Sequence, residues 1–134
     1  MNIDDIMDML DWNNPPIVQE KGRKLAREIR CINVFMQPGH FGHCKNVWDN
    51  CAQILAERSD RELRPYFSKL LEWLEDMNWP GADCIFQRLI QFQDTKWFDY
   101  CINEYKHIAK ALEMEIWEEN LRELQEARKR EMEQ

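Results

Sequence analysis

The chain has 134 residues, of which 44% are hydrophobic and 32% are charged, and its formal net charge is −7. This length fits one domain with a buried core, while the acidic balance disfavours nucleic acid as a partner because phosphate binding relies on clustered Lys and Arg. No run approaches the ~20 apolar residues of a membrane span, and acidic residues stand at the N-terminus where a secretion signal would carry positive charge. We therefore expect a cytoplasmic protein without a membrane segment.

The first pair of predicted helices is broken between Asn13 and Pro16. Apolar residues at helical spacing predict a helix over residues 3–12, capped by Asn2, and a second helix that begins near Pro16. Gly22 falls on the apolar face of the second helix, where its missing side chain would allow close helix approach. Residues 31–36 have a strand-like composition but no predicted pairing partner, so we interpret them as a buried helical end.

Two further helices are predicted in the middle of the chain. A loop over residues 37–42 precedes a helix over 44–58, and Ser59 with Glu62 forms a capping box that starts the next helical segment. Pro65 would disrupt a helix interior, so we expect a short turn over 60–64 and then a helix from Pro65 to Met77. These segments extend the pattern of paired helices.

The bend around Asn78 to Gly81 is the strongest local signal in the sequence. The apolar face of one helix ends with Leu70, Leu71 and Leu74. The ring of Pro80 fixes φ at a value suited to the first turn of a new helix. A weaker copy lies 64 positions earlier, where Asn14 precedes Pro16. We expect Asn14 and Asn78 to cap the helices opened by Pro16 and Pro80.

The remaining sequence continues the helical pattern. Asp94 and Thr95 are expected to end one helix and cap the next, whose apolar stripe runs from Trp97 to Leu124. Residues 113–134 carry eight Glu against four basic residues, and their sparse apolar content predicts fraying. We predict an all-α fold of about six helices in stacked antiparallel hairpins, with a helical domain over 1–112 and an acidic extension over 113–134.

Two segments resemble a known family. The run LLEWLEDMNWP from Leu70 to Pro80 resembles the signature of domain of unknown function 5071, and DTKWFDY from Asp94 to Tyr100 is similar to that family's Asp-x-x-Trp segment. The resemblance covers roughly Ser59 to Ile102. It implies a small HEAT-like helical stack, and an immunity or antidote role because such relatives are sometimes seen near bacterial toxin systems.

The bend also contains the candidate binding residues. Acidic and aromatic side chains alternate there, a composition able to anchor a basic protein. The predicted partner-binding residues are Glu72, Trp73, Asp76, Asn78 and Trp79. We expect a non-catalytic protein-interaction module with no cofactor and no bound metal.

Two alternatives stay open at this point. His40, His43 and Cys44 offer two imidazoles and a thiol, which suit a zinc site or a thiol enzyme, although no fourth ligand follows at an established spacing. The apolar stripe from Tyr105 to Leu124 would alternatively support self-association as a homo-oligomer through the C-terminal helix. The five cysteines are odd in number and lack paired spacing, which favours reduced thiols.

Overall fold

The computed structural model describes residues 2–38 and 44–133, and its secondary structure in these ranges is helical, without strands. The prediction of an all-α fold is confirmed. No helix in these two ranges is long and apolar enough to cross a membrane. In chain order the elements are α1 (Ile3–Met9), α2 (Pro16–Ala26), η1 (Ile32–Phe35), η2 (Lys45–Val47), α3 (Trp48–Ala56), α4 (Asp60–Leu63), η3 (Arg64–Tyr66), α5 (Phe67–Glu72), η4 (Trp73–Glu75), α6 (Ala82–Ile90), α7 (Thr95–Ala111) and α8 (Glu115–Met132), where η denotes a 3₁₀ helix.

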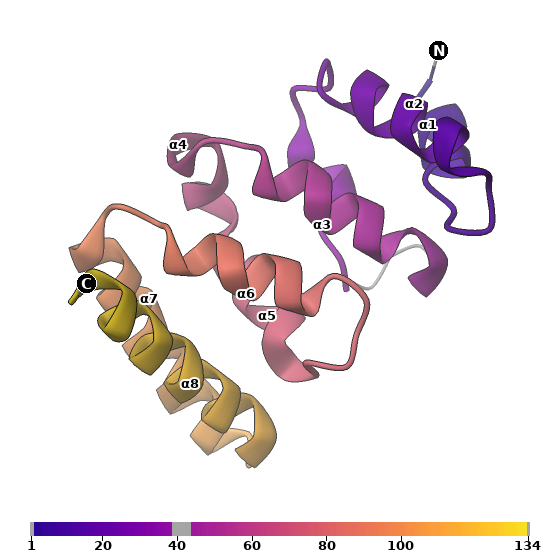
Figure 1. The fold of residues 1–134 in the computed structure, drawn as a ribbon. Helices are drawn as coiled ribbons and strands as arrows, with labels where there is room; N and C mark the ends of the chain where they lie inside the picture. Colours follow the sequence, from indigo (N-terminus) through magenta and orange to yellow (C-terminus); the bar gives the residue numbers. More distant parts are fainter. Residues whose placement is uncertain (1, 39–43, 134) are drawn as a thin grey trace.

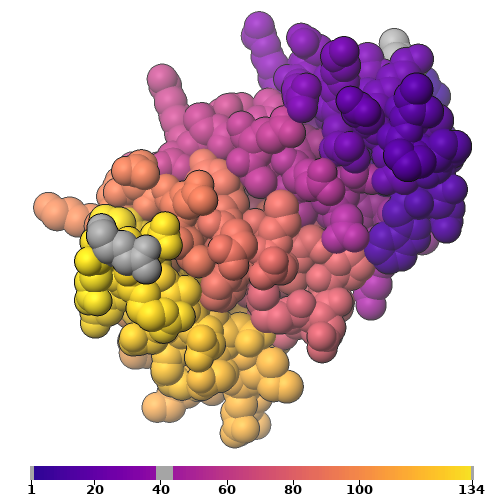
Figure 2. All heavy atoms as spheres, viewed as in Figure 1, coloured from indigo at the N-terminus to yellow at the C-terminus, as the bar shows by residue number. Residues whose placement is uncertain are grey.

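The elements stack as four pairs along one axis (Figure 1). Helix α1 packs on α2, η1 on α3, the α5–η4 segment on α6, and α7 on α8. The second members, α2, α3, α6 and α8, contact one another in chain order and form one layer of the stack. The two ends of the chain therefore lie at opposite ends of the molecule, and the space-filling view shows the sequence colours in successive bands (Figure 2).

One apolar core runs through all four pairs. Large side chains from every pair are almost fully buried and belong to a single cluster. At Gly22 the backbones of α1 and α2 approach closely, since an added Cβ would lie 2.8 Å from Cβ of Met9. Burial of this kind is the main stabilising contribution in a domain of this size. The cluster includes Leu10, Phe35, Leu55, Leu71, Leu74, Leu89, Ile102 and Leu124.

The first helix ends earlier than predicted, at Met9. The Asn14 side-chain amide donates to the carbonyls of Asp8 (2.7 Å) and Met9 (3.3 Å), so it satisfies orphan acceptors at the C-terminus of α1. Pro15, without a side-chain hydrogen bond, occupies the N-cap of α2. The expectation that Asn14 caps the helix opened by Pro16 is therefore wrong. The predicted Asn2 cap is confirmed as a capping box with Asp5.

The segment over residues 31–36 contains a separate 3₁₀ helix, η1 (Ile32–Phe35), and is not the end of the preceding helix. Helix α2 stops at Ala26, and the guanidinium of Arg58 donates to the carbonyls of Ala26 and Ile29, both at 2.8 Å. From a neighbouring pair, Arg58 thus binds the last carbonyl of α2 and a carbonyl of the turn that follows it. The short η1 then takes the first position of the second pair, against α3.

The predicted helix from Pro65 to Met77 is divided into three pieces, η3, α5 and η4. Pro65 lacks a backbone N–H and lies in the first 3₁₀ turn, where the tighter hydrogen-bond pattern accommodates it. The capping box is confirmed: Ser59 Oγ accepts from the Glu62 N–H, and Glu62 Oε1 accepts from the Ser59 N–H, both at 3.2 Å. In this segment the helix boundaries therefore follow the capping box and Pro65 more closely than the continuous apolar periodicity.

The C-terminal stripe does not continue as one helix. Glu113 has a φ of 58° and turns the chain back, so that α8 runs beside α7. Trp117 Nε1 donates to the Leu71 carbonyl (2.9 Å), and Asn120 Nδ2 donates to the Leu74 carbonyl (2.7 Å). The predicted fraying over residues 113–134 is therefore wrong for α8, whose inner face is part of the core.

Candidate protein-binding site at the bend

The bend is built by a local hydrogen-bonded turn after η4. Asp76 leaves the helical conformation at φ −143°, and its Oδ1 accepts from the Asn78 N–H at 2.8 Å. The Trp79 N–H then donates to the Asp76 carbonyl at 3.0 Å. This arrangement is typical of an Asx turn, in which an Asp side chain replaces a backbone acceptor.

Gly81, and not Asn78, is the N-cap of the following helix. Helix α6 begins at Ala82, two residues later than the predicted start at Pro80. Gly81 has a φ of +84°, and an added Cβ would lie 2.9 Å from the Trp48 carbonyl oxygen and 2.7 Å from Cβ of Ala52. Glycine is required here both by the left-handed backbone and by the close approach of α3. The expected capping by Asn78 is wrong.

Trp73 is fully buried, at 0% exposure. Its indole N–H donates to the Pro80 carbonyl at 2.9 Å, and its ring packs edge-to-face on Trp48 at a centroid distance of 6.2 Å. A partner cannot reach this side chain, so the structure places Trp73 among the residues that hold the bend together. Trp79 also packs edge-to-face on Trp48, at a centroid distance of 5.6 Å, and is only partly buried.

Three carboxylates precede the bend. Glu72 and Asp76 are partly exposed, and Glu75 lies between them in the sequence. Burial, together with the nearby charge of Glu72, raises the pKa of Glu75. A carboxylate that is costly to ionise marks a locally negative and partly desolvated surface.

Two more carboxylates, those of Asp49 and Asp83, act on the Cys84 thiol near the start of α6. Burial raises the pKa of the Cys84 thiol, and the charges of Asp49 and Asp83 raise it further. Both carboxylates therefore lie near the Cys84 sulfur. Asp83 follows the bend directly in α6, and Asp49 follows Trp48, on which Trp79 packs. Sequence reasoning missed Asp49 because only the packing of α3 against the bend brings it here.

We use the name acidic bend for the five carboxylates of Glu72, Glu75, Asp76, Asp49 and Asp83. None of them forms an ion pair within residues 2–38 and 44–133. The exposed Asn78 and the partly exposed Trp79 lie in the turn that connects Asp76 to α6. The structure thus groups four of the five predicted binding residues at a surface and places the fifth in the interior.

The sequence model described as Domain of unknown function (DUF5071) matches residues 45–130. The chain belongs to the DUF5071 family. The match is longer than the resemblance over Ser59 to Ile102, since it also covers α3 and most of α8. Searches of curated proteins and of solved structures gave no match.

The alternative site in the loop falls mostly outside the described residues. His40 and His43 lie there, whereas Cys44 is described and exposed. Within residues 2–38 and 44–133, no group of three or more His, Cys, Asp or Glu residues is arranged to hold a metal ion. The metal or thiol site of this DUF5071 member stays a prediction.

The core cysteines have raised thiol pKa values. Burial raises the pKa of Cys51 to about 12, and burial also raises the pKa of Cys101, partly offset by the charge of Arg64. A thiol with a raised pKa is protonated at neutral pH and is a poor nucleophile. These two cysteines act as small apolar side chains within the core.

Proposed function

We propose that this DUF5071 protein is a non-catalytic interaction module that binds a basic segment of a protein partner at the acidic bend. The observation that supports it best is the concentration of five carboxylates without an ion-pair partner in the described chain around one rigid turn. A partner that supplied Lys or Arg would relieve their mutual repulsion. Complementary charge of this kind gives both orientation and a fast association rate.

The carboxylates stand on well-fixed backbone. The bend is held by the Asp76 side chain, by the Trp73 bond to Pro80, and by close packing of Gly81 against α3. A rigid site loses little conformational entropy when a partner binds. Trp79 adds a partly exposed aromatic surface beside the negative charge, and such a surface favours contacts with Arg or Lys through cation–π interactions.

Several acidic side chains elsewhere on the surface form ion pairs with arginines. Arg58 pairs with Glu62, Arg122 pairs with Glu118 and Glu119, and other bridges join Arg27, Arg64 and Arg88 to neighbouring acids. Each of these pairs reduces the net field outside the protein. The acidic bend groups negative charge without such compensation in the described residues, as α1 also does with Asp4, Asp5 and Asp8, and the bend places Trp79 beside that charge.

An immunity or antidote role is the specific form of this proposal. It rests on the family resemblance, and it requires the basic partner to be a toxin whose activity falls when the acidic bend is occupied. Co-expression tests it: a toxin encoded beside this gene should be tolerated with the wild-type protein and not with a variant that lacks the carboxylates. Equal protection by both proteins would exclude the acidic bend as the antidote surface.

The general proposal is tested with a double variant, Glu72→Gln and Asp76→Asn. The asparagine keeps a side-chain oxygen for the Asn78 N–H, so the turn should persist while two charges are removed. A basic partner captured from the producing cells with the wild-type protein should bind this variant about tenfold more weakly or worse in calorimetric titration, since a hydrogen bond to a charged group contributes roughly 1.5–3 kcal/mol.

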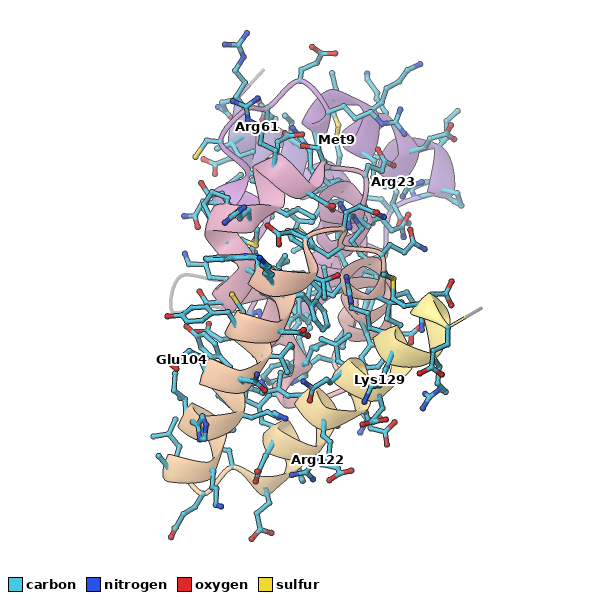
Figure 3. The ribbon with its side chains drawn as sticks, turned by 90° about the vertical axis from the view of Figure 1, so that its left-hand side faces the viewer. Met9, Arg23, Arg61, Glu104, Arg122 and Lys129 are labelled. Atoms are coloured by element: carbon cyan, nitrogen blue, oxygen red, sulfur yellow. The ribbon has the colours of Figure 1, made fainter. Side chains whose placement is uncertain are left out.

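A matched control removes two charges elsewhere. Glu104→Gln with Glu123→Gln changes exposed carboxylates of α7 and α8 that form no ion pair within the described chain. Glu104 projects from the outer side of α7 (Figure 3). This control should bind the partner as wild type does. Equal weakening of both double variants would indicate a response to net charge alone, and would refute the assigned site.

A further inference from the structure

Arg88 and Arg128 occupy equivalent places where one helical pair of the stack meets the next. We call each such contact between consecutive pairs a joint. Arg88 Nη2 donates to the Arg58 carbonyl (2.9 Å), two residues after the end of α3. Arg128 Nη2 donates to the Phe92 carbonyl (2.8 Å), two residues after the end of α6. Each arginine thus satisfies a carbonyl just beyond the C-terminus of the second helix of the preceding pair, where a cation is favourable.

The two joints differ in the second partner of the arginine. Arg88 Nη2 also binds Oδ1 of Asp60, the first residue of α4, at 2.6 Å. Arg128 Nη2 binds Oγ1 of Thr95, the first residue of α7, at 3.0 Å. A hydroxyl therefore stands at the last joint where the preceding joint has a carboxylate.

This difference leaves Arg128 without a directly bonded carboxylate in the described chain. Arg128 is only 4% exposed, forms no ion pair with residues 2–38 or 44–133, and has a buried Nε with no hydrogen-bond partner in those ranges. Its guanidinium lies over the Phe98 ring at 4.6 Å, which offsets part of the charge. Buried charges are normally paired, because desolvation of a lone ion is costly.

A cavity lies beside the Arg128 guanidinium. It has a volume of about 520 Å³ and is formed between the start of α7 and the end of α8. Thr95 and Arg128 both line it, together with the amides of Asn103 and Gln125 and the apolar side chain of Met132. Small-molecule sites commonly have this size and a few converging polar groups. Figure 3 shows the two helices side by side, with Lys129 in the last turns of α8.

We propose that this cavity binds a small molecule that carries one carboxylate and one amino group, with the carboxylate on Arg128. The ligand carboxylate supplies the counter-charge that Asp60 supplies to Arg88 at the preceding joint. The Thr95 hydroxyl donates a hydrogen bond to the same ligand carboxylate. Because Arg128 Nη2 already donates to Phe92 and Thr95, the ligand carboxylate accepts from the remaining N–H groups of the guanidinium, and such charge-assisted hydrogen bonds are short and strong.

The charges around the cavity favour a zwitterion over a simple anion. Asp99 and Glu126 line the cavity with Arg128 and Lys129, which gives two negative and two positive groups. A multiply charged anion such as phosphate would meet two carboxylates, whereas an amino group on the ligand would gain from them. The ligand class is therefore an amino acid or a related amino carboxylate.

The test is a titration of the full-length wild-type protein, followed through the side-chain Nε–H resonances of its arginines by NMR. The probes are L-alanine, 4-aminobutyrate, acetate and inorganic phosphate. At least one amino carboxylate should shift the Arg128 resonance and bind more tightly than acetate, and phosphate should bind most weakly. Absence of any shift with both amino carboxylates would overturn the proposal, and so would phosphate as the tightest probe.

Thr95→Asp provides the matched variant, because it gives the last joint the same first residue as α4. The new carboxylate should pair with Arg128, raise the melting temperature, and weaken binding of the amino carboxylate by about tenfold or more. Thr95→Ser keeps the hydroxyl and should bind as wild type does. Unchanged affinity in a folded Thr95→Asp protein would refute the site, and the wild-type titration decides the proposal if that variant does not fold.

Discussion

Trp73 and Pro80 are joined across the bend by a hydrogen bond from the indole N–H to the backbone carbonyl at 2.9 Å. The bond connects the last 3₁₀ turn of one helical segment to the residue before the N-cap of the next. Trp73 therefore fixes the angle between the two members of the third pair, and with it the position of the carboxylates on both sides of the turn.

Trp73→Phe should keep most of the buried apolar area and lose this hydrogen bond. The Pro80 carbonyl would be left without its partner, so the free energy of unfolding should fall by about 1–3 kcal/mol. Urea denaturation followed by circular dichroism measures this change. Trp12→Phe is the control, because Trp12 lies at the first bend but is 46% exposed, and it should have almost no effect. Equal effects of the two substitutions would contradict the role assigned to Trp73.

Gly81→Ala should destabilise the protein more than a typical glycine substitution. The left-handed φ of +84° is unfavourable for alanine, and the added Cβ would meet atoms of Trp48, Ala52 and Trp73 within 3.0 Å. Backbone strain of about 1–3 kcal/mol adds to an overpacking cost of similar size. Gly22→Ala also meets a close Cβ contact but has an ordinary helical backbone, so its loss in denaturation experiments should be smaller. A larger loss for Gly22→Ala would show that backbone conformation is not the deciding factor.

The features that sequence predicts well here are those with a local physical cause. Asn2 and Ser59 cap their helices through side-chain oxygens, and Asp94 accepts from the Trp97 N–H at 3.0 Å at the start of α7. Each signal involves residues within three or four positions of one another. The bend at Asp76 to Gly81 is of the same kind, and its place in the chain was predictable from the end of the apolar face at Leu74 and from Pro80.

The features that sequence does not predict depend on contacts between distant segments. The reversal before α8 uses Glu113 in a left-handed conformation, although no glycine or proline marks it. The inner face of α8 is fixed by bonds from Trp117 and Asn120 to carbonyls about forty-six positions earlier. At the candidate site, likewise, helical spacing could not distinguish a buried Trp73 from an exposed one, since the bend turns that side chain toward α3.

The pH dependence of stability should contain a contribution from Glu75. Its folded-state pKa is raised above the ordinary value of 4.5 by burial and by Glu72, so the native state binds more protons than the unfolded state in the window just above that value. Stability should therefore fall as pH rises through this window. Glu75→Gln removes the titration and should raise stability at neutral pH relative to wild type.

Glu62→Gln supplies the opposite case for the same measurement. Hydrogen bonds from the Ser59 backbone and from Arg58 lower the pKa of Glu62, so its contribution is present at neutral pH and is lost as pH falls through the lowered pKa. Denaturation at several pH values should show destabilisation by Glu62→Gln at neutral pH only. If Glu75→Gln and Glu62→Gln changed the free energy of unfolding in the same direction near neutral pH, the environments assigned to Glu75 and Glu62 would be contradicted.

Removal of residues 113–134 tests whether residues 1–112 form a domain of their own. Truncation after Leu112 would leave the carbonyls of Leu71 and Leu74 without their partners and would expose the face of α7 that α8 covers. Burial of a single large apolar side chain contributes roughly 1.5–3 kcal/mol, and α8 buries Trp117 and two leucines, against a typical total stability of about 5–15 kcal/mol. The truncated chain should therefore lose its cooperative thermal transition, whereas removal of residues 133 and 134 alone should leave it intact. A cooperative transition of the 1–112 chain near the melting temperature of the full-length protein would show instead that α8 is an appendage, as the sparse apolar pattern of the C-terminal sequence suggests.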